Sequence, residues 1–424
     1  MVSAIKNGSE LRIMALDDTT SIPSALYHGG RAIQRKTPGL LMLLFYLGLS
    51  GCIAPPALDV SVMSYDKVTT DLLSQQLLLN IARARHHQPI HFTAVSNIAA
   101  TFDFRFSAGG TPALTGNSGG MIVPTFGGSV AENPTITIVP IEGEEFTKRL
   151  LTPIQESMLT MLLQQGADID LVLRLLAGEF RELQDRGEVV YHNRPTDAGY
   201  VRFRQIVSHL SSIQDRNMLF VEPLRFEQRL EYPRSEIKPE LLPDLEKEYL
   251  VRMNVSRGVY ELSKTITGRI IMTNYDPATL SNEEKIRLNT WAETTPSNEL
   301  SVDIRPGYDG GEYPIQGNFR LRSLANIINF LGKGIAEELE FDVPKDPRTP
   351  YISENPSRTL AITESDSSPS GDEISVSYRD HHYALQPEKG YQWNREGFTL
   401  LHQLFQMTVT ELPRSGIPSL TIAK

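Results

Sequence analysis

Apolar residues recur along the chain with two different periods, one typical of helices and one typical of strands. Between residues 142 and 180 they return every three or four positions, with breaks at Pro153 and Gly166, which predicts two or three helices. At residues 102–106, written FDFRF, aromatic and charged residues alternate, which predicts a half-buried strand. The first half of the chain therefore mixes both kinds of element.

Capping residues indicate where several of these helices begin. Thr70 can cap a helix over residues 70–85, whose last turn carries Arg83 and Arg85. Asp168 is placed to cap the last of the helices between 142 and 180, and Ser281 with Glu284 forms a capping-box pattern. Further helices are predicted at 198–213, 281–291, 323–339 and 395–409.

The second half alternates strand-like and helical segments and ends in a recognisable order. A hairpin over 374–386, with its turn at Asp380 and His381, precedes the helix at 395–409 and a last strand at 419–423. This β-β-α-β order suggests a module that closes one sheet. The predicted fold class is α+β, with mixed, mainly antiparallel sheets and packed helices.

Residues 107–134 are rich in glycine and proline, which argues against regular structure and predicts a long loop. It is either a flexible surface excursion or a partner-binding segment, such as a hairpin that joins neighbouring subunits. We place an N-terminal domain at 67–222 and a C-terminal domain at 257–424. The charged, proline-punctuated residues 223–256 between them form either a linker or exposed subdomain, or a helical arm.

Composition excludes some functions. The 424 residues carry a net charge of -10, so the chain lacks the basic surface that binding to nucleic acid requires. Cys52 is the single cysteine, which rules out an intramolecular disulfide and a zinc site built on several thiolates.

The segment before Cys52 has the pattern of a signal peptide. Arg31, Arg35 and Lys36 precede an apolar run of 13 residues at 39–51, which is too short to span about 30 Å of hydrocarbon as a helix. The stretch before Lys36 is long and contains acidic residues, which indicates either a translation start downstream of Met1 or an extended basic region.

Leu49, Ser50, Gly51 and Cys52 resemble the lipobox of bacterial lipoprotein precursors. The resemblance implies that residues 1–51 are removed and that Cys52 receives a diacylglycerol and an N-linked acyl chain such as palmitate. More than one acyl chain gives stable membrane attachment. No acidic residue follows the cysteine, which implies sorting to the outer membrane, facing the periplasm.

The mature chain would begin with a flexible tether at 52–66, because Pro55 and Pro56 resist helix formation. Loss of residues 1–51 removes five basic and three acidic residues, which leaves 36 basic and 48 acidic ones and a net charge near -12. This charge repels anionic lipid headgroups, so the lipid must provide the attachment.

Several segments of the mature chain resemble a family of proteobacterial envelope lipoproteins with no established activity. They read QLLLNIARAR, GEEFTKRLLTPI, LRSLANIINFLGKG, ISVSYRDHHYALQ, GFTLLHQLFQM and PSLTIAK. The resemblance covers most of the mature chain and implies an envelope location and one co-evolved architecture. It supplies no catalytic residue.

No group of residues makes a convincing catalytic or metal site. Residues 116–120, GNSGG, are similar to the nucleophile motif of HtrA-type serine proteases, but the histidines at 86, 87 and 91 lie too close upstream for a double barrel. Pro89 prevents those histidines from sharing a helical face, and His381 and His382 fall in a predicted turn. We predict no metal and no cofactor.

The remaining polar candidates have simpler explanations. Glu142, Glu144 and Glu145 favour a helix N-terminus, and the glycines at 109 and 110 lead into a loop rather than a phosphate-binding helix. Tyr378, His382 and Tyr383 are expected to pack in the hairpin, although they could line a glycan or peptide site.

The sequence therefore predicts a non-catalytic, lipid-anchored scaffold or assembly subunit with protein partners in the envelope. Two alternatives stay open. A ligand-binding lipoprotein would have a large apolar pocket with a few polar groups, and a tethered cell-wall or glycan hydrolase would have a cleft with a perturbed carboxylate or a His-paired nucleophile.

Overall fold

A computed structural model describes residues 54–112, 122–368, 374–387, 392–409 and 420–423. The predicted signal peptide and Cys52 lie outside these residues. The chain divides into two units at Val62, and all of the fold described below, apart from the first residues of one helix, belongs to the unit Met63–Lys424. None of its described helices is both long and apolar enough to cross a membrane.

The first described element is the helix α2 (Ala54–Arg85), which begins sixteen residues before the predicted helix. It takes the place of the predicted tether over 54–66. Pro55 and Pro56 are tolerated there because the first turn of a helix has N–H groups without intrahelical acceptors. Thr70 is therefore not a cap; its Oγ1 donates to the Asp66 carbonyl within the helix at 3.0 Å. The basic last turn is as predicted.

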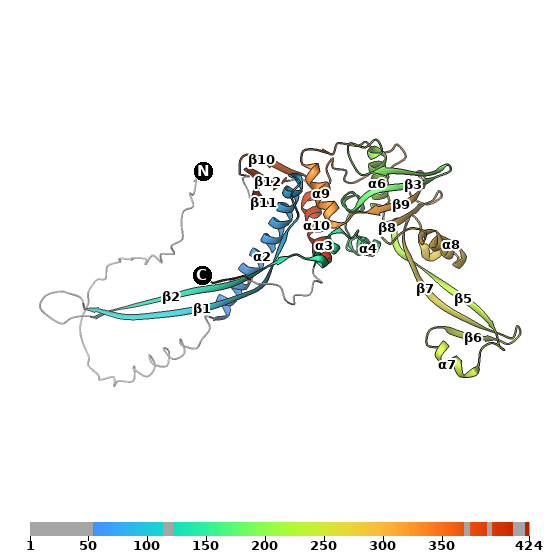
Figure 1. Cartoon of the computed structure of the whole chain (residues 1–424), viewed down its shortest axis with the longest axis horizontal. Coiled ribbons are helices and arrows are strands. Elements are labelled where there is room, and N and C mark those ends of the chain that lie inside the picture. Colours follow the sequence, from blue (N-terminus) through green and yellow to red (C-terminus); the bar gives the residue numbers. More distant parts are fainter. Residues whose placement is uncertain (1–53, 113–121, 369–373, 388–391, 410–419, 424) are drawn as a thin grey trace, which may run out of the picture. The chain divides into compact units, whose positions relative to one another are not determined.

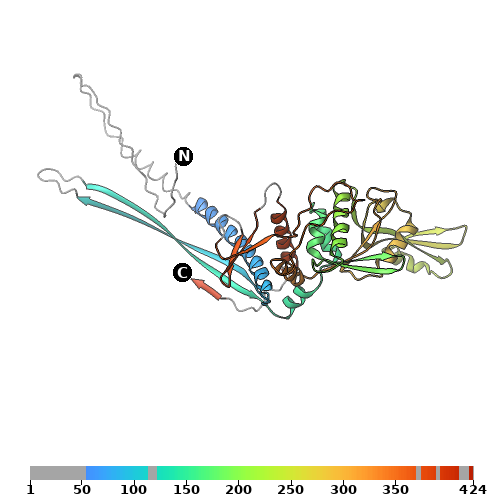
Figure 2. The same ribbon diagram turned by 90° about the horizontal axis from the view of Figure 1, so that it is seen from above.

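The described residues of the glycine-rich segment, 107–112 and 122–134, lie in the paired strands of a long antiparallel hairpin. The prediction of a loop is wrong for these residues, whereas the hairpin was the alternative, and residues 113–121 lie outside the described ranges. Strand β1 (Phe92–Pro112) pairs with β2 (Ile122–Ile141) from Phe92 opposite Ile141 to Pro112 opposite Ile122. The strands run side by side in both views (Figure 1, Figure 2). Pairing between strands supplies the backbone hydrogen bonds that local composition argued against.

The next three helices are those predicted from the apolar period. They are α3 (Glu144–Leu151), α4 (Glu156–Gln164) and α5 (Ile169–Leu176), and they are separated at Pro153 and Gly166. Asp168 caps α5 as predicted, since its Oδ1 accepts a hydrogen bond from the Asp170 N–H at 2.7 Å. Every residue of α5 is buried.

A seven-stranded sheet follows, in the order β4-β3-β9-β8-β7-β5, with β6 also paired to β7. Its pairs are antiparallel except β7 with β8, which are parallel. The strands are β3 (Ala177–Gln184), β4 (Gly187–His192), β5 (Phe220–Pro233), β6 (Leu250–Asn254), β7 (Val259–Thr273), β8 (Glu299–Ile304) and β9 (Ile315–Leu321). The α+β class is confirmed.

This sheet crosses the boundary that the sequence suggested. Residue 222 lies inside β5, and strands from both sides of it pair in one sheet. The charged segment 223–256 contains most of β5, the short helices η1 (Pro239–Leu241) and α7 (Leu242–Leu245), and β6. A helical arm there is therefore wrong. Its charged residues are compatible with strands because most of these positions are exposed.

The remaining helices cover the sheets and connect them. They are α6 (Tyr200–Gln214), η2 (Pro277–Thr279), α8 (Asn282–Ala292), α9 (Leu324–Gly334) and α10 (Trp393–Val409). The capping box of Ser281 and Glu284 at the start of α8 is confirmed. Helix α9 ends five residues earlier than predicted, at Gly334.

A small third sheet has the order β10-β12-β11, built from β10 (Ile362–Ser365), β11 (Ser375–Tyr378) and β12 (His381–Leu385). The hairpin turn is at Arg379 and Asp380, both with positive φ, one residue before the predicted turn. The last strand, β13 (Leu420–Ala423), pairs with β2 and not with this sheet. The β-β-α-β order thus exists, but it does not close one sheet.

A cluster of charged side chains lies in the interior beside the apolar core. Arg174 on α5 and Arg204 on α6 have at most 1% of their side chains exposed. Arg174 lies 3.6 Å from both Asp170 and Glu340, and Arg204 lies 3.9 Å from Glu340. Burial alone would raise the pKa of Glu340, but the two arginines and two hydrogen bonds from Thr359 lower it.

The two arginines also hold the segment between α9 and β10. Arg174 donates to the carbonyls of Pro356 and Ser357 at 2.9 and 3.0 Å. Arg204 donates to the same two carbonyls and to the Asn355 side chain. The backbone at 355–357, which belongs to no helix or strand, thereby obtains its hydrogen-bond partners from buried cations.

Replacing Glu340 with glutamine should strongly destabilise the protein. The substitution leaves Arg174 and Arg204 buried with too little negative charge, and breaking a buried ion pair on one side costs about 3 to 5 kcal/mol. Urea unfolding, followed by tryptophan fluorescence, measures the loss. Glu248→Gln is the control, because Glu248 is 66% exposed and lies 3.6 Å from Lys264 on the surface. Equal shifts in the two variants would contradict the role of the cluster.

The raised pKa of Asp168 predicts that the free energy of unfolding depends on pH. Burial, together with the nearby Asp170, raises the pKa of Asp168 from 3.8 to about 6. The folded state therefore binds this proton more tightly, and the associated stability is lost as the pH rises from about 4 through 6. Asp168→Asn keeps an oxygen for the cap, so it should raise the melting temperature at pH 7 and flatten the dependence between pH 4 and 6. Parallel pH profiles would disprove this account.

Candidate functional site

Aromatic and histidine side chains that the sequence places far apart meet at the end of α2. The ring of His86, just after α2, lies 5.6 Å from Tyr378, 6.4 Å from His381 and 6.2 Å from Tyr383 between centroids. The histidine of one predicted cluster thus joins the tyrosines of another. We use the name α2 junction for the contacts of Arg85 and His86 with Glu337, Glu364 and Tyr383.

A chain of hydrogen bonds runs through the α2 junction. The hydroxyl of Tyr383 donates to Glu364 Oε1 at 2.7 Å, and His86 Nε2 lies 2.7 Å from the same hydroxyl. Because the tyrosine has one proton and gives it to the carboxylate, the histidine must be the donor of the second bond. His86 therefore carries its proton on Nε2.

Arginine completes the α2 junction. Arg85 Nη1 lies 3.1 Å from Glu337 Oε1, which follows α9, and Arg85 Nε lies 3.6 Å from Glu364 Oε2 on β10. The end of α2 is thus joined to two other elements by charged contacts. The contact with Glu337 is a charge-assisted hydrogen bond and is directional, so it fixes how the helix end is oriented as well as where it lies.

The pKa shifts in the α2 junction favour a structural role. Burial, then the hydrogen bond and charge of Glu364, raises the pKa of Tyr383. Burial, followed by the positive charges of Arg379 and Arg85, lowers the pKa of His86. Both groups are therefore neutral at pH 7. A tyrosine that acts as an acid or nucleophile needs a pKa shifted in the opposite direction.

Two polar side chains of α2 hold the base of the β1–β2 hairpin. The buried Asn80 donates to the His91 carbonyl at 2.8 Å and accepts from the His91 N–H at 2.9 Å. Gln76 accepts from the Thr93 N–H at 2.9 Å. The backbone that leads into β1 is therefore paired to side chains of α2. We call these contacts of Asn80 and Gln76 the hairpin clamp.

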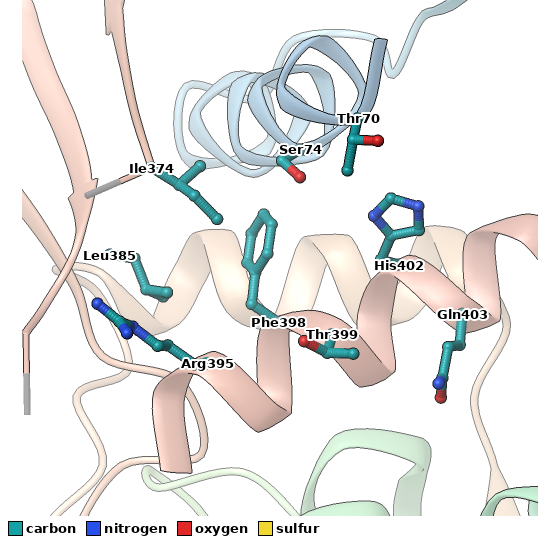
Figure 3. Close-up of a pocket in the computed structure, with 9 residues that line it drawn as sticks. All are labelled: Thr70, Ser74, Ile374, Leu385, Arg395, Phe398, Thr399, His402 and Gln403. Carbon is teal, nitrogen blue, oxygen red and sulfur yellow. The ribbon is translucent and has the colours of Figure 1, made fainter. Parts of the chain in front are cut away.

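A groove lies between α2 and α10, with a volume of about 620 Å³. Figure 3 shows Phe398 rising from α10 towards Ser74 on α2, with His402 below Thr70. Burial lowers the pKa of His402, so the imidazole is neutral at pH 7. The complete lining is Thr70, Ser74, Ile374, Leu385, Arg395, Phe398, Thr399, His402 and Gln403. The groove offers mainly apolar surface and no carboxylate.

Two other cavities lie in the described part of the chain. One, of about 450 Å³, contains Asp168, Glu354 and Glu396. The other, of about 760 Å³, lies at the carboxyl ends of the parallel strands β7 and β8, where the rings of Tyr275 and Tyr308 are 5.2 Å apart. The hydroxyl of Tyr275 donates a hydrogen bond to Asp303 Oδ2. Burial, followed by this hydrogen bond, raises the pKa of Tyr275. Neither cavity pairs a nucleophile with a base.

The structure places the other sequence candidates as follows. Glu144 and Glu145 lie in the first turn of α3, as expected. Gly109 and Gly110 lie within β1, opposite Thr125 and Pro124, and not at the start of a loop. His382 contacts Ser377 through Nδ1 at 2.9 Å.

Other candidates fall outside what the structure describes. These are Leu49, Ser50, Gly51, Cys52 and the GNSGG segment at 116–120. Within the described ranges, no three or more His, Cys, Asp or Glu side chains are grouped so that they could hold a metal ion. His91 takes part in the hairpin clamp through its backbone.

Sequence reasoning missed Asn80, Gln76 and Glu364. Asn80 did carry a signal, because it interrupts the apolar run from Leu77 to Ile81. A single polar residue in such a run is either exposed or fully bonded. Glu364 carried no local signal, since its partners lie far away in the sequence.

Comparisons with known proteins assign no family and no function to this chain. No protein-family model matches the chain, and no curated protein and no solved structure matches it either.

Replacing Asn80 with leucine should loosen the base of the hairpin. Leucine is close in shape but removes the acceptor of the His91 N–H and one of the two donors to the His91 carbonyl, which keeps Arg83 Nη1 at 3.1 Å. Loss of these partly buried hydrogen bonds should cost about 1 kcal/mol. Hydrogen exchange, read by mass spectrometry, should become faster in the peptide containing residues 91–93. Gln164→Leu, at an exposed position of α4, is the control. Unchanged exchange in Asn80→Leu would show that the clamp does not hold the hairpin.

Proposed function

We propose that this chain is a non-catalytic, lipid-anchored subunit of an envelope assembly, attached to the outer membrane through Cys52 and facing the periplasm. The attachment rests on the lipobox-like residues 49–52, on the basic and apolar segments before them and on the absence of an acidic residue after Cys52. The acidic mature chain would make the lipid the main attachment.

The observation that carries the assembly role is the open edge of the β1–β2 hairpin. Among the described residues, β1 pairs with β2 alone, so one edge of a strand of 21 residues has no partner strand. Unpaired strand edges are sites where other chains add strands. The hairpin clamp and the α2 junction position this edge relative to the helix that follows the proposed anchor.

The groove between α2 and α10 supports a second candidate, a ligand-binding lipoprotein. Its volume of about 620 Å³ falls in the range of small-molecule sites, and its lining is mainly apolar. A hydrolase receives less support, because Tyr383, whose hydroxyl lies 2.7 Å from His86 Nε2, has its pKa raised by burial and by Glu364.

Lipid attachment through Cys52 predicts a specific labelling result. Cells fed an alkyne analogue of palmitate should label the wild-type protein and leave Cys52→Ala unlabelled, because no other cysteine is present. Ser50→Ala keeps a small residue in the motif and should still label. The wild type should fractionate with the outer membrane. Label on Cys52→Ala would overturn the proposed location.

The assembly role is tested on the same membranes. Affinity capture after mild detergent should bring down envelope proteins, or further copies of this chain, in a fixed ratio to the wild type. Labelled wild-type protein that is captured alone would contradict the assembly role and favour the ligand-binding alternative. In that case, the groove variant Phe398→Ala should change the binding of an apolar fluorescent probe.

A further inference from the structure

The β1–β2 hairpin has two outer edges, and they are not equivalent. The outer edge of β2 holds β13 at residues 135–138, where Leu420 lies opposite Ile138. No described strand pairs with the rest of that edge, from Ile122 to Pro134, or with the outer edge of β1. The pairing with β13 shows that the edge of β2 accepts an antiparallel strand.

The open edges leave many backbone groups without a protein partner. In an antiparallel pair, about half of the N–H and carbonyl groups of each strand point to the outer side. Over a strand of 21 residues this gives a long row of donors and acceptors. A two-stranded ribbon is marginally stable at best by itself and gains stability from further strands or from packing against a helix. Here α2 bonds only to the hairpin base, at His91 and Thr93, and β13 pairs only with residues 135–138 of β2.

The register pairs residue types in a regular way. Apolar residues stand opposite apolar ones at Ile98 with Ile136, Phe104 with Val130 and Ala108 with Phe126. At the odd-numbered positions of β1 from 97 to 109 the pairs are polar or small, as at Arg105 with Ser129 and Ser107 with Gly127. Among the even-numbered positions, Phe102 departs from the pattern because it stands opposite Glu132. Apart from that pair, apolar and polar positions alternate in phase along both strands over residues 97–109 of β1. A strand that extends this sheet must have the same period, a similar length and an antiparallel direction.

From this arrangement we infer that the hairpin pairs with the hairpin of a second copy of this chain, with the outer edge of β1 in one copy against the free edge of β2 in the next. The inference deepens the proposed assembly function and rests on it, because it names the partner.

Three features favour a second copy as the partner. Strands β1 and β2 are antiparallel, so β2 of a neighbour placed beside β1 continues the antiparallel sheet. The two strands have nearly equal lengths, 21 and 20 residues. Their apolar and polar positions are already in phase with each other, so the same alternation continues across the new pair.

The inferred contact joins two different edges, so it is heterologous. Each added copy leaves one free edge of β1 and one of β2, and growth stops when the copies close into a ring. This predicts copies linked β1 to β2, and not β1 to β1. Introduced cysteines can distinguish β1–β2 linkage from β1–β1 linkage, because Cys52 is the only native cysteine and would be occupied by the lipid.

The test uses two differently tagged copies of the full chain, co-expressed and oxidised in isolated membranes. One copy carries Arg105→Cys on β1, and the other carries a cysteine at position 123, 125, 127, 129, 131 or 133 on β2. One position, or two adjacent ones, should give a mixed-tag disulfide dimer, since a disulfide needs Cα atoms within about 7 Å. The β4 variant Val190→Cys, at an exposed position on an edge strand, should give none.

Each possible result of the cross-linking test supports or contradicts the inferred contact. A dimer formed by Arg105→Cys with itself would indicate two-fold β1 pairing and overturn the heterologous contact. If no β2 position cross-links while the wild type still brings down other envelope proteins, the second copy is wrong and the assembly function stands. If nothing cross-links and nothing is captured, both fail. If all variants reach the outer-membrane fraction in equal yield, misfolding is excluded as the cause of a missing cross-link.

Discussion

Two arginines without access to solvent hold the centre of this structure. Arg174 and Arg204 face the buried Glu340, and their other N–H groups bind carbonyls at 356 and 357. Arg174 also lies over the ring of Trp393 at 5.4 Å, and Trp393 Nε1 donates to the Thr359 carbonyl. The position of α10 therefore depends on the cluster. Phe405, further along α10, contacts Phe92 at the start of β1 at 4.4 Å between centroids, so the base of the hairpin depends on the same charges.

The end of α2 is held by polar contacts as well as apolar ones. Leu77, Leu78 and Ile81 are fully buried, and burial of this kind provides most of the free energy without selecting one orientation. Asn80 and Tyr383 add hydrogen bonds that are satisfied in one arrangement. The neutral His86 suits such a connection, because burial and the nearby positive charges of Arg379 and Arg85 lower its pKa and its ring is uncharged at pH 7.

Elements with local signals were predictable from the sequence. The cap at Asp168, the capping box at Ser281 and the 374–386 hairpin depend on residues a few positions apart, and the structure contains all three. The sequence indicated a strand at 102–106 and allowed a hairpin over 107–134, but the extent of the β1–β2 pairing was not predictable, because glycine and proline weaken local propensity and the stability of the hairpin comes from pairing between strands. The candidate site was predictable only in pieces. His86 and Tyr383 both stood out, but 297 positions separate them, and no periodicity indicates that they touch.

The pairing of β13 with β2 has a consequence for the order in which the protein folds. Leu420 lies near the end of the chain and its partner, Ile138, in the first third, so this contact spans most of the sequence. Contacts between such distant positions form slowly, because a large loop must close first. During synthesis, the outer edge of β2 at residues 135–138 is therefore uncovered until β13 has been made. Any factor that binds this edge early competes with the chain's own last strand, and folding of the tail is the step at which that competition is decided.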